Sequence, residues 1–212
     1  MHPHEPTSLY AHEYRKSINL DISARCPLQC PRCRREDYKI AGRKPPGHDL
    51  SLKDFDKILF YFNSILFCGQ ASDPTAHPLF HDFLRRSYEE GVYVCIATAA
   101  SHRKEDWYRE AFRINPKAIW RFGIDGLPEE SNLYRINQDG KYLWRMALIA
   151  KEMGLKVEQQ CIVFSYNEGH INEVEKHATD AGIVFLKLYS SRWNNEDPYQ
   201  PKLEGNFVKW QN

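Results

Sequence analysis

Three cysteines, Cys26, Cys30 and Cys33, are spaced as C-x3-C-x2-C directly after an apolar stretch. Thiolates are ligands for iron–sulfur clusters and for zinc. Three thiolates can bind three irons of a cubane [4Fe–4S] cluster and leave the fourth iron open to a small molecule, whereas four ligands close the site. The spacing therefore predicts an open metal site, with zinc and a distant fourth ligand such as a histidine as the alternative.

Composition limits the classes of protein to consider. The chain has 212 residues, and its 29 basic and 28 acidic side chains give a formal charge of +1. This balance offers no bulk electrostatic reason to expect nucleic acid or a membrane surface as a partner. No apolar run is long enough to span a bilayer, and the polar N-terminus lacks the apolar core of a signal peptide. We therefore expect a cytoplasmic protein.

The remaining cysteines are Cys68, Cys95 and Cys161, and each falls in an expected strand. A buried free cysteine behaves as a small apolar residue, which is the interpretation favoured here. A reduced chain fits this pattern better than a disulfide framework, in agreement with a cytoplasmic location.

The hydrophobic pattern alternates between strand and helix along the chain. Strands are expected where apolar residues alternate or form short β-branched runs, and helices where apolar residues recur at helical spacing before a glycine. A polar stretch is expected between the cysteines and residue 47. The six expected strands cover residues 17–24, 65–68, 92–98, 118–124, 156–164 and 183–189, and the expected helices cover residues 52–63, 77–90, 104–113, 141–153 and 171–181.

Each crossover is long enough for a parallel β-α-β connection, and such connections are right-handed. Six βα units predict an α/β fold, either an open barrel or a doubly wound sheet, and periodicity does not choose between the two. We expect an N-terminal extension over residues 1–16 and a core domain over residues 17–190. Residues 191–212 form a polar tail with scattered aromatic side chains, which either covers the mouth of a barrel or is mobile.

Unusual motifs follow the expected strands, at the end where open α/β folds bind their ligands. Gly69, Gln70 and Asp73 come after the second strand. Small residues there let the backbone approach a ligand, and exposed carbonyl groups with Asp73 can accept hydrogen bonds from an ammonium group. An ordinary turn is the alternative interpretation of this segment.

Hydroxyl and charged side chains follow the next two strands. Thr98 and Ser101 come after the third strand, where their hydroxyls can meet a ribose or cap the following helix. Gly123 lies in the fourth strand. Arg135 comes further along the chain and can form a bidentate pair with a carboxylate, with a solvated surface arginine as the alternative.

Together these motifs resemble the radical S-adenosylmethionine (SAM) enzymes over roughly residues 17–190. The cysteine loop resembles the cluster loop of that family, and residues 68–74 resemble its Gly-Gly-Glu-Pro motif, which holds the SAM amino group. Residues 98–101 resemble its Thr-Asn-Gly segment, with alanines in the last two places. The resemblance implies a partial (β/α)6 barrel with parallel strands, open on one side.

The resemblance also implies roles for further residues. Gly123 and Arg135 match a strand-4 segment that contacts the SAM carboxylate and ribose, and Gln160 and Val163 lie in the strand-5 segment near ribose and adenine. In the family, SAM chelates the open iron of the cluster. An electron from the cluster then splits SAM into methionine and a 5′-deoxyadenosyl radical, which abstracts hydrogen from the substrate.

Two departures from the family narrow these expectations. Arg32 stands where the family often has an aromatic residue, so the backbone at this position, rather than the side chain, is expected near adenine. The strand-4 segment resembles the branch with SPASM or Twitch extensions, which carry further cluster-binding cysteines, but none follows Cys161 here. We therefore expect one [4Fe–4S] cluster and SAM as the cofactors.

Three functional hypotheses remain. The likeness to the SPASM branch favours a radical SAM enzyme acting on a peptide or protein side chain, and the short chain favours a nucleoside, sugar or other small metabolite. The third hypothesis is a non-catalytic zinc or iron–sulfur protein. An electron donor such as flavodoxin or ferredoxin is the expected partner of an enzyme. The arginines near the cysteines form either its docking face, a site for an anionic substrate or a solvated surface, and they are Arg25, Arg32, Arg34 and Arg35.

Overall fold

A curved sheet of six parallel strands organises the chain. The computed structural model describes residues 16–190, 193, 196–203 and 205–206. The strands are hydrogen-bonded in the order β1-β2-β3-β4-β5-β6, so the described β1 and β6 are edges that do not pair with each other. This confirms the predicted α/β partial barrel, open on one side. The strands are β1 (Ser17–Leu20), β2 (Ser64–Phe67), β3 (Tyr93–Thr98), β4 (Ile119–Gly123), β5 (Lys156–Ile162) and β6 (Val184–Leu188).

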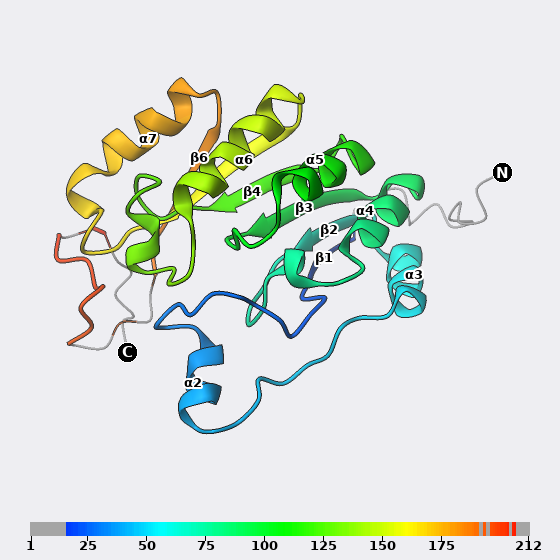
Figure 1. Cartoon of the computed structure of the whole chain (residues 1–212), viewed down its shortest axis with the longest axis horizontal. Helices are drawn as coiled ribbons and strands as arrows, with labels where there is room; N and C mark the ends of the chain where they lie inside the picture. The colour runs from blue at the N-terminus through cyan, green and yellow to red at the C-terminus, as the bar shows by residue number, and fades with distance from the viewer. Residues whose placement is uncertain (1–15, 191–192, 194–195, 204, 207–212) are drawn as a thin grey trace.

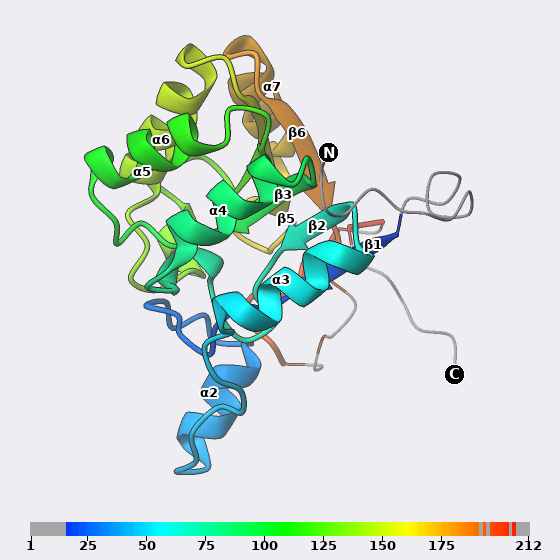
Figure 2. The ribbon, with the colours of Figure 1, turned by 90° about the vertical axis from the view of Figure 1, so that its right-hand side faces the viewer.

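Helices pack against the outer face of this sheet, as Figures 1 and 2 show. All five predicted helices are confirmed to within a few residues at their ends, and three short 3-10 turns lie in the connections. None of the helices in the described part of the chain is long and apolar enough to cross a membrane. The helices are α2 (Arg34–Ile40), α3 (Leu52–Tyr61), α4 (Phe80–Glu89), α5 (Glu105–Ile114), α6 (Gly140–Glu152) and α7 (Ile171–Asp180), and the 3-10 turns are η1 (Pro74–Ala76), η2 (Ser131–Leu133) and η3 (Glu168–His170).

Helix α2 was not expected from the sequence, which predicted only a polar stretch there. It has no buried residue, so it lacks the apolar stripe that periodicity detects. Its acidic first turn, with Glu36 and Asp37, suits the positive end of the helix dipole, and Lys39 pairs with Glu36 one turn away. In Figure 2 the helix projects from the body of the molecule, away from the other helices.

The first strand ends at Leu20, four residues earlier than predicted. The next polar residues bind neighbouring loops instead of extending the ladder: Asp21 accepts hydrogen bonds from the loop after β2, and the Ser23 hydroxyl donates to Asp49 at 2.8 Å. The early end releases the chain for the cysteine loop.

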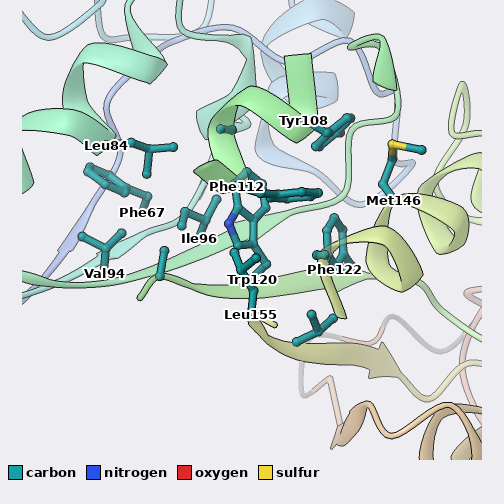
Figure 3. Packing of buried hydrophobic residues seen from close by; sticks show 14 of the residues in the cluster. Phe67, Leu84, Val94, Ile96, Tyr108, Phe112, Trp120, Phe122, Met146 and Leu155 are labelled. Atoms are coloured by element: carbon teal, nitrogen blue, oxygen red, sulfur yellow. The ribbon is translucent and has the colours of Figure 1, made fainter. Parts of the chain in front are cut away.

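The hydrophobic core lies between the outer face of the sheet and the helices. In β4, Trp120 and Phe122 point outward and are fully buried, and Trp120 meets Phe112 of α5 edge-on at 4.9 Å between ring centroids (Figure 3). Side chains of this size contribute about 1.5–3 kcal/mol each when buried, so this layer is the main source of stability. The fold is therefore held from outside, which leaves the inner face of the sheet available for a ligand.

Candidate functional site

A cavity of about 440 Å³ opens at the carboxyl ends of the strands. It reaches from the cysteine loop to the inner face of the sheet, so the predicted metal site and the predicted strand-end motifs share one space. The predicted site residues that line it are Cys26, Cys30, Cys33, Gly69, Gln70, Asp73, Thr98, Gly123, Arg135 and Gln160.

The three cysteines lie on one short, tethered loop. The Cys33 amide donates to the Cys30 carbonyl at 2.9 Å, and Cys33 is also the residue before α2. The Arg35 guanidinium donates to the carbonyls of Ala24 and Ala71, which ties this loop to the loop after β2. The backbone therefore presents the thiols from a fixed scaffold.

The thiols are partly buried at the cavity wall. Burial raises the pKa of Cys26 to about 12, with a further rise from the Asp73 charge, and it raises the pKa of Cys30 to about 11. Thiols bind metals as thiolates, so a metal ion that binds at this loop must displace the protons of the thiols. A metal centre is therefore what would hold these side chains ionised.

The donor set fits a cluster. In the described part of the chain, no three His, Cys, Asp or Glu side chains converge closely enough to hold one ion. A cubane does not require such convergence, because each thiolate binds a different iron. The three thiols face a common cavity with room beside them for a small molecule, as an open cluster requires.

The loop after β2 approaches the cavity closely because it contains Gly69. A Cβ atom at this position would lie 1.6 Å from the Ser72 carbonyl oxygen, so no larger residue fits. The amides of Gln70 and Ala71 donate to the Asp21 carboxylate at 3.0 and 3.3 Å. Sequence analysis missed Asp21, which appeared only as a residue within the first expected strand.

Asp73 has a different role from the one predicted for its side chain. Its carboxylate is buried and accepts hydrogen bonds from Thr75, from the Thr98 hydroxyl, and from the amides of Ala99 and Ala100 at 2.9 and 3.1 Å. An ammonium group would meet a carboxylate whose acceptor positions are already used. The Thr98 hydroxyl is committed to the same cluster of bonds rather than open to a ribose, so the two residues join the loops after β2 and β3.

Arg135 pairs with a carboxylate, but it is the carboxylate of Asp125 in the protein, through an ion pair and one hydrogen bond. Its Nε lies 2.7 Å and its Nη2 3.3 Å from the Asp125 carboxylate, which also accepts from the Ile162 amide at 2.8 Å. Burial works against the charge of Arg135, but the charges of Asp125 and Cys30 and the hydrogen bond to Asp125 together raise its pKa above the ordinary value, so the guanidinium stays charged. A Cβ at Gly123 would lie 3.1 Å from this guanidinium, which explains the glycine.

Gln138 is a second site residue that sequence analysis missed. Its side-chain amide donates to the carbonyls of Ala99 and Gly123 at 2.6 and 2.9 Å, so it links the ends of β3 and β4. It comes from the connection before α6 and has no motif around it. Only its burial, which the sequence does not show, marks it.

Three predicted site residues do not line the cavity. The Val163 side chain is fully buried in a small outer cluster with Ile171 and Val174, because side chains alternate along the strand direction and this one points away from the cavity. The Ser101 hydroxyl accepts from the Asp139 amide at 2.8 Å, next to the start of α6. Arg32 is the third and contacts the C-terminal tail.

The described part of the tail packs against Arg32, Tyr134 and the segment after β5. The Arg32 Nε forms an ion pair with Asp197 at 2.8 Å, and its guanidinium lies 4.0 Å from the centroid of the Trp193 ring. Tyr199 packs edge-on against Tyr134 at 5.1 Å and accepts the Ser165 amide through its carbonyl. Whether the tail covers the mouth stays a prediction, since none of its described residues lines the cavity. Residues 191–192, 194–195, 204 and 207–212 lie outside the described part of the chain, as do residues 1–15 of the predicted N-terminal extension.

The remaining basic residues of the cysteine loop are mostly engaged. Arg25 pairs with Asp49 at 2.7 Å, and Arg35 is used in tethering the loop. Among the cysteines outside the loop, Cys161 is fully buried as predicted, but Cys68 lines the cavity instead of the core. Its position after the end of β2 explains the difference.

Comparisons with known proteins agree on the fold. No protein-family model matches the chain. A curated relative is a tungsten-containing aldehyde ferredoxin oxidoreductase cofactor-modifying protein of Pyrococcus furiosus, 26% identical over 177 residues. The match covers 79% of this chain and 49% of the relative, so the chain spans about half the length of the curated protein.

Solved structures share most of this chain's architecture. Native anSMEcpe with bound AdoMet gives a TM-score of 0.64 at 20% identity, covering 88% of this chain and 56% of that one. Streptococcus suis SuiB bound to S-adenosylmethionine gives 0.69 at 17% identity, covering 88% and 43%. Methylornithine synthase gives 0.62 at 13% identity, covering 81% and 52%. The fold that the sequence resemblance implied is thus confirmed.

Proposed function

We propose that this chain is the core of a radical SAM enzyme that binds one [4Fe–4S] cluster through Cys26, Cys30 and Cys33. The observation that carries the proposal is that these three thiols open into the same cavity as the ends of β2, β3, β4 and β5. A structural zinc site has no need of such a space beside it. Structures with the same fold hold AdoMet, which supports SAM as the second ligand.

The residues of the chain position the cofactors. When bound, the cluster and SAM supply the electron and the 5′-deoxyadenosyl radical that abstracts hydrogen from the substrate. Gly69 lets the backbone after β2 approach the polar end of SAM, where carbonyl groups are the acceptors for its ammonium group. The Arg135 guanidinium, oriented by Asp125, lines the cavity near the end of β4, and Gln160 adds an amide to the same lining.

A peptide or protein side chain is the proposed substrate, with an electron donor such as flavodoxin or ferredoxin as partner. One of the structures with this fold is Streptococcus suis SuiB bound to the precursor peptide SuiA, and another is anSMEcpe with AdoMet and a peptide. A small metabolite is the second candidate. It is favoured by the curated relative, which is named for modifying a cofactor, and by methylornithine synthase.

The test begins with anaerobic reconstitution, iron analysis and reduction with dithionite in the presence of SAM. We expect four irons per chain, as a [4Fe–4S] cluster requires, and release of deoxyadenosine and methionine, detected by mass spectrometry. The triple variant Cys26→Ala, Cys30→Ala, Cys33→Ala removes every proposed ligand and is expected to bind no cluster. Cys161→Ala is the matched control, because this cysteine lies in the core, and it should load normally.

Two results would reject the proposal. One is full iron loading in the triple variant, which would place the ligands elsewhere. The other is a loaded wild-type protein that binds SAM yet forms no deoxyadenosine with any reductant, alone or with candidate substrates. Pools of peptides and of small metabolites then separate the two substrate classes, because the pool that contains the substrate increases the yield of deoxyadenosine.

A further inference from the structure

The inner face of the sheet carries an ion pair deep in the cavity. Arg121 of β4 lies opposite Ala97 of β3 and Glu158 of β5 in the strand register. Its Nε lies 2.7 Å from Glu158 Oε2, and the side chains are 26% and 19% exposed. Arg121 precedes Gly123 by two residues in β4, so both side-chain positions are on the inner face of the sheet. Both residues line the same cavity as the cysteines.

Polar residues in this position need an explanation. Strands of a parallel sheet are usually apolar on both faces, and the interior of a closed barrel is filled with branched apolar side chains. Here the outward residues of β4 and β5 include Trp120 and Phe122, whereas the inward ones include Arg121 and Glu158. The inner face therefore carries polar side chains, and Asn19 of β1 and Gln160 of β5 also line the cavity.

Arg121 has unused donors. Within the described residues, Glu158 accepts from its Nε, and neither Nη1 nor Nη2 makes a hydrogen bond. A guanidinium presents its donors in a planar fork that suits carboxylate and phosphate oxygens. The small side chain of Ala97 beside it leaves room for such a group.

We infer that Arg121 binds an anionic group of the substrate, a carboxylate or a phosphate, and thereby fixes which part of the substrate faces the cofactors. This inference rests on the proposed function, because the cofactors would occupy the cavity above it. Glu158 orients the guanidinium through Nε, and its carboxylate makes the net charge of the pair lower than that of Arg121 alone. For a peptide substrate, the anion is an acidic side chain or a C-terminal carboxylate near the residue that reacts.

The experiment measures binding of small anions to the reconstituted protein with SAM bound and the cluster left oxidised, so that no turnover occurs. Calorimetric titrations use glutarate, inorganic phosphate and glutaramide, the neutral analogue of glutarate. The wild type is expected to bind glutarate or phosphate and not glutaramide, and the stronger of the two anions identifies the class. Arg121→Gln should weaken anion binding by about tenfold or more, as loss of a charge-assisted hydrogen bond implies.

Two further variants separate this role from a structural one. Glu158→Gln removes the neutralising charge and should tighten anion binding, whereas an ion pair with only a structural role would give lower stability and unchanged binding. Arg85→Gln breaks the surface pair with Asp82, whose separation is 2.9 Å, and should leave binding as in the wild type. Equal affinity in the wild type and Arg121→Gln, or wild-type binding of glutaramide, would overturn the inference.

Failure of the proposed function shows separately. The same titrations on protein that has not been reconstituted test Arg121 without the cluster. If the wild type cleaves no SAM but anion binding depends on Arg121, the enzyme proposal fails and the anion site stands. If SAM is cleaved and anion binding does not depend on Arg121, the enzyme proposal stands and the anion site is rejected.

Discussion

The carboxylate of Asp73 accepts a hydrogen bond from the hydroxyl of Thr98 at 2.9 Å, across 25 residues of sequence. Amides of the loop after β3 bind the same carboxylate. Two loops that each follow a strand are thereby fixed against one another, and the floor of the candidate SAM site is formed before any ligand arrives.

Replacing Asp73 by alanine should therefore destabilise the protein strongly. The variant leaves several buried donors without an acceptor, at a cost of about 3 kcal/mol or more in the free energy of unfolding. Urea denaturation measures the loss. The control is Asp82→Ala, which removes only an exposed ion pair and should cost less than about 1 kcal/mol. A variant with wild-type stability but weaker SAM binding would instead restore the sequence-based role of Asp73 as a direct ligand.

Removing the Arg135 side chain should affect stability as well as SAM binding. Arg135→Ala leaves the Asp125 carboxylate buried without its partner, which costs about 3–5 kcal/mol. The double variant Asp125→Asn, Arg135→Gln removes both charges and should be more stable than Arg135→Ala alone. Chemical denaturation of Asp125→Asn, Arg135→Gln and the double variant yields the coupling energy between the two side chains. Additive losses would show that the two residues act independently.

The link between Arg32 and the tail should be visible in hydrogen exchange. The Tyr199 amide donates to Asp197, which in turn pairs with Arg32, so Arg32→Ala should accelerate exchange in residues 196–203. Mass spectrometry of peptides from this segment gives the rates. Arg34→Ala, at the start of α2 and without a described contact to the tail, is the matched control. Identical exchange in both variants would mean that the tail docks without Arg32.

Stability should fall at acidic pH because of His77. One ring nitrogen lies 3.1 Å from the Leu50 carbonyl and the other accepts the Leu79 amide, which fixes a neutral ring, and burial lowers the pKa of His77 below its ordinary value of 6.5. The unfolded chain then binds more protons than the folded one. The contribution is thus complete above pH 6.5 and is lost as the pH falls through the folded pKa. Denaturation curves between pH 5 and 8 should show a smaller slope for His77→Gln, and an unchanged slope would point to His81 and His102, whose pKa values burial also lowers.

The sequence predicts the elements better than the contacts between them. Apolar spacing marks all six strands and the five helices that have a buried face, whereas α2 has none and escapes detection. The cysteine loop is evident because its spacing is local. Gln138 and Asp21 act through partners that are distant in sequence, and no local pattern marks them. The outward orientation of the Val163 side chain was missed because this residue lies just beyond the end of β5 at Ile162. The alternation of side chains between the two faces of a strand is hard to extend past the strand's last residue from the sequence alone.

The ion pair between Arg32 and Asp197 also fixes the shape of the opening in the barrel. The tail leaves the edge strand β6 and reaches the loop that follows the other edge strand, β1, so the two edges are joined at their carboxyl ends. A gap fastened at one end can widen only at the other. Thermal bending of the sheet therefore changes the width of the opening least beside the cysteines and most at the amino ends of β1 and β6.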